Sequence, residues 1–179
     1  MPEENHILFF DLEVNPKNGE ILKIGALLNG SPFSGAGLPA FQHFARPARL
    51  LCGHNIFDHD LPVLKAAEAA SWLFDKPAID TLRWSALLFP KKPYHHLVKD
   101  YQLAGVHLNN PLADAQLSKE LLGDLLAAFH DLPSRLKTVY VSLLREAPEF
   151  RGFFQLVKAD FLPEPITGPM LTEYFQRHF

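Results

Sequence analysis

The hydrophobic and polar positions in the first part of the chain predict a small antiparallel sheet. Residues 7–10 form an unbroken apolar run, which is typical of a central strand buried on both faces. Residues 21–28 and 31–35 are predicted as two further strands, and Asn-Gly pairs at 18–19 and 29–30 predict a tight turn before each of them. Because tight turns impose antiparallel pairing, these three strands should form a meander.

The next part of the chain alternates between strands and helices. Strands are predicted over residues 49–53 and 77–80, and an apolar stripe over residues 60–74 predicts a helix between them. A helical crossover of this kind makes the two strands parallel. Shorter helices are predicted on either side of this unit, over residues 38–44 and 81–88, the second with Asp80 as its cap.

Helical periodicity dominates the remainder. A helix is predicted over residues 94–103, followed by a long helix over residues 111–129 with Asn110 as its cap. The core stripe of the long helix should include Leu117, Leu121, Leu125 and Phe129. We expect an α/β core over residues 1–130, whose mixed sheet has five strands, three antiparallel and two parallel, with helices on both faces. Residues 131–179 should form a helical C-terminal extension, with one apolar face that includes Leu143 and another over residues 150–157. Because its apolar pattern runs to the last residue without a cap, we expect the chain to be cut from a longer protein.

Four acidic residues stand where these elements would direct them toward the interior. Asp11 and Glu13 follow the central apolar run two residues apart, so both side chains project from one face of the strand. Asp60 and Asp114 each head the apolar stripe of a helix, whereas Asp58 would lie outside that stripe. Like charges near a buried strand end are costly unless a cation lies between them, and carboxylate oxygens favour Mg²⁺ or Mn²⁺. The alternative for the first pair is a solvated acidic turn.

Composition narrows the classes of function. The 179 residues are 47% hydrophobic and 21% charged, as expected for a globular domain with a sizeable core. A single cysteine excludes an internal disulfide, and no run is long enough for a membrane span, so we expect a cytoplasmic protein. The net charge of −3 argues against a protein that binds long nucleic acid through overall positive charge. An acidic site that holds metal ions can still act on phosphates. The chain has no Gly-rich phosphate loop, nucleophile elbow or zinc-like Cys/His set.

Three motifs in this order resemble the DEDD-type 3′–5′ exonucleases of the ribonuclease-H-like superfamily, those similar to proofreading subunits and ribonuclease T. The first motif resembles FDLE at residues 10–13, the second GHNIFDHDLP at 53–62, and the third LADA at 112–115. The resemblance covers roughly residues 6–129 and implies a ribonuclease-H-like sheet. The C-terminal helices also look similar to exonuclease modules fused to RecQ-like helicases.

The resemblance implies a set of site residues and a cofactor. Two Mg²⁺ or Mn²⁺ ions would be held by four carboxylates: Asp11, Glu13, Asp60 and Asp114. One ion would lower the pKa of the attacking water, and the other would stabilise the leaving 3′-oxygen. The resemblance further implies that Leu12, His54 and Asn55 contact the terminal nucleotide.

The general base of the family is missing from its usual positions. The histidine subclass places its base five residues before the last aspartate and the tyrosine subclass four residues before it, and these positions hold Asn109 and Asn110. An asparagine can orient a water but cannot take its proton. Our first candidate for a replacement is His95, which would share one helix face with Lys99. The second candidate is His107.

We therefore expect a two-metal-ion 3′–5′ exonuclease that releases mononucleotides from single-stranded nucleic acid, with DNA favoured over RNA. Two alternatives remain open. One is a catalytically degenerate module that binds a 3′ end without cutting it, and the other is an exoribonuclease. The implied partners are single-stranded 3′ ends and, from the helicase resemblance, a helicase domain or a polymerase-type protein, with no membrane.

Overall fold

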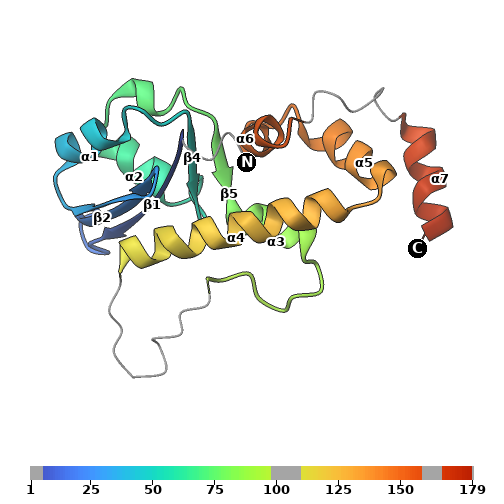
Figure 1. The fold of residues 1–179 in the computed structure, drawn as a ribbon, viewed down its shortest axis with the longest axis horizontal. Coiled ribbons are helices and arrows are strands. Elements are labelled where there is room, and N and C mark those ends of the chain that lie inside the picture. The colour runs from blue at the N-terminus through green and yellow to red at the C-terminus, as the bar shows by residue number, and fades with distance from the viewer. Residues whose placement is uncertain (1–5, 98–109, 159–166, 179) are drawn as a thin grey trace.

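The structure is a computed structural model that describes residues 6–97, 110–158 and 167–178. Its centre is a five-stranded sheet with the order β3-β2-β1-β4-β5 (Figure 1). The strands are β1 (Ile7–Val14), β2 (Ile21–Leu28), β3 (Ser31–Gly35), β4 (Leu50–Gly53) and β5 (Ala78–Asp80). Strands β1, β2 and β3 pair antiparallel, whereas β4 runs parallel to both β1 and β5. The predicted α/β class and the mixed sheet of five strands are confirmed.

The antiparallel half of the sheet follows from its turns. Asn29 and Gly30, which join β2 to β3, have φ angles of 52° and 79°, as a two-residue hairpin turn matching the strand twist requires. Gly19, with φ of 74°, serves the turn between β1 and β2. Strand β3 contains Pro32, which is tolerated because β3 is an edge strand of the sheet.

Helices cover both faces of this sheet (Figure 1). They are α1 (Leu38–Ala45), α2 (Asp60–Ala66), the 3₁₀ helix η2 (Ser71–Leu73), α3 (Thr81–Leu88), α4 (Pro111–Asp131), α5 (Ser134–Leu144), α6 (Pro148–Leu156) and α7 (Gly168–His178). Helices α1 and α2 share one apolar core with the sheet, and α3, α4 and α6 share a second core on the other face. Helix α7 lies at the far end, beyond α5 (Figure 1).

The two cores are separated by the alternation of side chains along β1. Leu8, Phe10 and Leu12 belong to the core beneath α1 and α2. Ile7 and Phe9 belong to the core beneath α4. Because side chains alternate in a strand, the odd-numbered carboxylates that follow them lie on the α4 face.

The predicted helix over residues 60–74 is wrong in its second half. Helix α2 ends at Ala66, and only the short helix η2 follows it. Glu68 adopts a left-handed conformation with φ of 56°, its amide donates to the Lys65 carbonyl, and the Ala69 amide donates to the Leu64 carbonyl. This pair of hydrogen bonds is a Schellman motif, which terminates a helix.

The predicted helix over residues 94–103 is wrong at its start, and residues 98–103 lie outside the described part of the chain. Residues 94–97 are irregular. The ring Nδ1 of His95 instead lies 2.8 Å from Ser85 Oγ, and this contact holds the segment against α3. Over residues 94–97, this tertiary contact stands where the start of the helix was predicted.

Three further expectations need correction. The side chain of Asn110 makes no capping hydrogen bond, although its position before α4 is as predicted. The predicted core stripe of α4 included Leu117 and Leu121, which are only half-buried. The buried face is rotated from it and consists of Pro111, Asp114, Ala115, Ser118, Leu122, Leu125 and Phe129. In α5, Leu143 was predicted to be buried but is 55% exposed.

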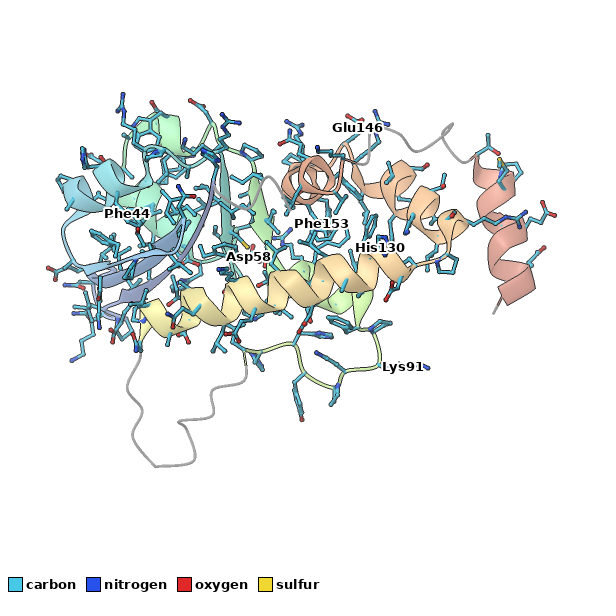
Figure 2. All side chains as sticks on the ribbon, viewed as in Figure 1. Phe44, Asp58, Lys91, His130, Glu146 and Phe153 are labelled. Carbon is cyan, nitrogen blue, oxygen red and sulfur yellow. The ribbon has the colours of Figure 1, made fainter. Side chains whose placement is uncertain are left out.

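Helix α6 completes the second core at the edge strand β5. A Cβ atom added to Gly152 would lie 2.4 Å from the Ala78 carbonyl oxygen, so only glycine allows this approach. Next to it, Phe153 points from α6 toward α4 and stacks on Trp84 with a centroid distance of 3.9 Å (Figure 2). The apolar face predicted for residues 150–157 is confirmed, and the domain boundary at residue 130 stays a prediction.

Candidate functional site

Asp11 and Asp114 are brought toward each other by a close contact between α4 and the sheet. Asp11 is paired with Gly25 of β2. A Cβ atom on Gly25 would lie 2.0 Å from the main-chain nitrogen of Leu112, so the first turn of α4 rests directly on this glycine. That turn carries Asp114, which is 6% exposed. Glu13 follows Asp11 on the same face of β1 and is half-buried.

Asp60 is tied to the same stretch of β1 from the other side. Its Oδ1 accepts a hydrogen bond of 2.9 Å from the amide of Leu12, which stands between Asp11 and Glu13. The Asp60 side chain is 1% exposed, and its Oδ2 has no hydrogen-bond partner among the described residues. Burial raises the pKa of this carboxyl, and the neighbouring ring of His59 and the Leu12 amide oppose that rise.

The structure separates Asp60 from its neighbour Asp58, as the sequence predicted. Asp60 begins α2 and heads its buried stripe, which continues to Leu64. Asp58 lies before the helix and is exposed. Both of its carboxylate oxygens accept from Arg83 Nη2, at 3.1 and 3.2 Å. Asp58 is therefore a surface ion-pair partner.

A further carboxylate organises the site and was predicted only as a helix cap. Asp80 is 0% exposed at the end of β5, and it does cap α3. Its oxygens accept from four main-chain amides: those of Leu82 at 2.9 Å, Asn55 at 3.0 Å, Arg83 at 3.4 Å and Phe57 at 3.5 Å. Asp80 thus holds the loop after β4 against the head of α3. The signal in the sequence was an aspartate at the end of a buried strand, but nothing in it indicated the two bonds to that loop.

The loop held by Asp80 carries His54 and Asn55, the residues expected to contact a nucleotide. Asn55 has a left-handed φ of 67°, a conformation that asparagine tolerates better than most residues. Nδ1 of His54 lies 2.9 Å from Thr81 Oγ1, and Thr81 Oγ1 also donates to the Gly53 carbonyl at 3.2 Å. Nε2 of His54 is buried and has no hydrogen-bond partner in the described part of the chain.

The other candidates for substrate contact and base are placed less favourably. The Leu12 side chain is 4% exposed and belongs to the core beneath α1 and α2, and its amide is bonded to Asp60. The His95 ring is held by Ser85 rather than by a helix of its own. Its predicted neighbour Lys99, the second candidate His107 and Asn109 all lie outside the described residues.

The donor chemistry of the site fits a hard cation, but the side chains are not gathered around one point. Within the described ranges, no three side chains of His, Cys, Asp or Glu are close enough together to hold one metal ion as they stand. The unpartnered, buried Oδ2 of Asp60 is the atom best suited to receive a cation, since a buried carboxylate oxygen is otherwise unsatisfied. Metal binding would require Asp11, Glu13 and Asp114 to turn toward it.

Comparisons with known proteins add no assignment. No protein-family model matches the chain, and neither does any curated protein or solved structure. Across the described residues, none of the helices has the length and apolar character needed to cross a membrane.

Proposed function

We propose that this protein is a metal-dependent 3′–5′ exonuclease with a ribonuclease-H-like fold, acting on single-stranded ends with DNA favoured. The proposal is carried by one observation above the others. The buried carboxylate of Asp60 is bonded to the main chain between Asp11 and Glu13 while its second oxygen lacks a hydrogen-bond partner among the described residues. A buried carboxylate with one oxygen left without a partner is costly unless a cation or a proton satisfies it.

The positions of the three motifs support the fold part of the proposal. The first motif ends the apolar run of the central strand β1, and the second runs from the end of β4 into α2. The third opens α4, which rests on β2 beside β1. Three antiparallel strands followed by two parallel ones is the sheet that the resemblance implies.

In this function the carboxylates Asp11, Glu13, Asp60 and Asp114 would hold two Mg²⁺ or Mn²⁺ ions. Bound ions would supply activation of water and neutralisation of charge on the phosphate, which a chain of net charge −3 does not provide by itself. The chain's own part is to position the end of the strand. The loop with His54 and Asn55, fixed by Asp80, would receive the terminal nucleotide.

Cleavage of 5′-labelled DNA and RNA oligomers, with Mg²⁺, Mn²⁺ or EDTA, tests the proposal. We expect metal-dependent shortening from the 3′ end by single nucleotides, with resistance of circular and 3′-phosphorylated strands. Asp60→Asn should abolish cleavage. Asp58→Asn is the matched control because Asp58 is exposed and pairs with Arg83, and it should keep full activity. Rapid cutting of circular strands, or an active Asp60→Asn variant, would contradict the proposal.

A second candidate function is a module that binds a 3′ end without cutting it, within a larger helicase or polymerase-type assembly. Two observations favour it. The proposed carboxylate ligands, as described, do not converge on one metal position, and an asparagine occupies the usual position of the general base. Binding of a labelled oligomer measured by fluorescence anisotropy, without cleavage in either metal, would support this candidate. Cleavage of the RNA oligomer in preference to DNA would identify an exoribonuclease.

A further inference from the structure

We propose that His54 is the general base of the reaction, its Nε2 taking the proton of the attacking water in place of the residue missing at Asn109. This inference rests on the proposed exonuclease function. It concerns a residue that the sequence assigned only to nucleotide contact.

The hydroxyl of Thr81 sets the tautomer of the His54 ring. Thr81 has a single hydroxyl hydrogen, and its Oγ1 donates to the Gly53 carbonyl at 3.2 Å. The contact of 2.9 Å between Thr81 Oγ1 and His54 Nδ1 must then be donated by the ring, as Nδ1–H. In a neutral ring this leaves Nε2 unprotonated, with a free lone pair. The reverse arrangement would give up the bond from Thr81 to the Gly53 carbonyl.

The surroundings of Nε2 keep the ring neutral and leave this nitrogen able to accept a proton. Nε2 is buried and without a hydrogen-bond partner among the described residues. Burial has the largest effect on the pKa of the His54 ring and lowers it, and the charge of His96 lowers it further by a smaller amount. Asp80, Asp114 and the main-chain carbonyl of His95 act against it and would stabilise the imidazolium once it forms. The ring is therefore neutral at neutral pH and has carboxylates nearby.

The position of His54 also fits the role. It follows β4 directly, and Asp80 fixes the loop that begins with it. The field of Asp114, one of the proposed metal ligands, acts on the ring. His95, the base expected from the sequence, is instead held by Ser85 on α3. His54 is thus within electrostatic range of the aspartate of the third motif, although it belongs to the second.

In the proposed step, the bond formed to phosphorus is matched by the bond broken. The water oxygen forms a bond to phosphorus while its proton passes to His54 Nε2. The bond between phosphorus and the 3′-oxygen of the preceding nucleotide breaks, and that oxygen keeps the electron pair and takes a proton from solvent. The imidazolium then releases its proton to solvent, and the products are a nucleoside 5′-monophosphate and a strand shorter by one residue.

The experiment measures the pH–rate profile of cleavage in Mg²⁺ for the full chain and two variants. His54→Asn keeps an amide N–H where Nδ1–H donates to Thr81 but has no group at Nε2. We expect a rate about 10²- to 10⁴-fold lower than wild type, as for loss of a general base. The wild-type rate should level off above the lowered pKa of His54, whereas the variant rate should keep climbing with pH. His130→Asn, an exposed site at the end of α4, is the control and should match wild type (Figure 2).

A second measurement is independent of catalysis. Long-range ¹H–¹⁵N NMR correlation of the histidine rings should show His54 as the Nδ1–H tautomer at neutral pH. The Nε2–H tautomer, or a His54→Asn variant that keeps the wild-type rate and profile, would overturn the assignment while leaving the exonuclease proposal intact. Absence of any cleavage by the wild-type protein would instead overturn the proposed function and the base with it.

Discussion

The closest packing in the candidate site predicts that Gly25→Ala will move the third motif away from the first. The added methyl group would start 2.0 Å from the Leu112 nitrogen, and ordinary van der Waals contact begins at 3.4 Å. The neighbouring atoms are main chain of the first turn of α4, so no side chain can swing aside. The turn must therefore lift by about 1.4 Å, and it carries Asp114 with it.

Two magnitudes follow from this displacement. Overpacking of this kind costs roughly 1–3 kcal/mol in free energy of unfolding, partly offset by the 0.5–1 kcal/mol that alanine gains over glycine within a strand. A misplacement of about 1 Å in a catalytic group lowers the rate roughly 10²-fold. Activity should thus fall much further than stability, and the variant should still be folded at 25 °C.

Urea unfolding and the 3′-end cleavage assay measure the two effects on the same preparation. The matched control is Gly123→Ala in the middle of α4, where an added Cβ meets nothing within 4 Å. This control should raise the free energy of unfolding by about 1 kcal/mol, because alanine replaces glycine inside a helix, and should leave cleavage unchanged. A Gly25→Ala variant as stable and active as wild type would refute the reasoning that this glycine sets the position of Asp114.

Three other changes have directions fixed by the structure. Burial raises the pKa of Asp60, so its contribution to stability is present at low pH and is lost as pH rises through the folded pKa. The Asp60→Asn variant should therefore melt at or above the wild-type temperature at pH 7 in EDTA. Mg²⁺ should raise the melting temperature of the wild type and leave that of the variant unchanged. Equal Mg²⁺ shifts in both proteins would exclude Asp60 as a ligand. Glu68→Gly should stabilise by up to about 1 kcal/mol in urea unfolding, since Glu68 occupies the left-handed position of a Schellman motif, and a loss of stability would show that its side chain contributes elsewhere. Gly152→Ala should destabilise by about 1–3 kcal/mol through the Ala78 carbonyl, and an unchanged unfolding midpoint would mean that α6 can shift freely on β5.

The elements that were predicted well are those specified by local chemistry. Strand β3 and helix α3 have the predicted bounds, because an Asn-Gly turn begins one and an aspartate cap begins the other. Asp60 and Asp114 were both predicted to face the interior, because each heads a helical stripe, and both are buried. Such signals lie within a few residues of the feature they determine.

The features that were missed depend on contacts between distant segments. The loop that holds His95 against Ser85 has no local signature, and neither do the hydrogen bonds from Asn55 and Phe57 to Asp80. The end of α2 was missed because a glutamate stands where a glycine would have marked the stop. The buried face of α4 is rotated because of how that helix docks on Gly25. The periodicity of a single helix carries no information about such a contact.

The stacking of Phe153 on Trp84 gives this protein an optical signal of its own. The chain has two tryptophans, and they stand in opposite surroundings. Trp84 is fully buried among phenylalanines, whereas Trp72 is half-buried with the cations of Arg46 and Lys76 at 5.8 and 5.1 Å from its ring. Iodide should therefore quench the emission of Trp72 and spare that of Trp84. In a Trp72→Phe variant, the remaining emission should shift to the red when α6 leaves the sheet, so undocking of that helix can be followed in real time without a label.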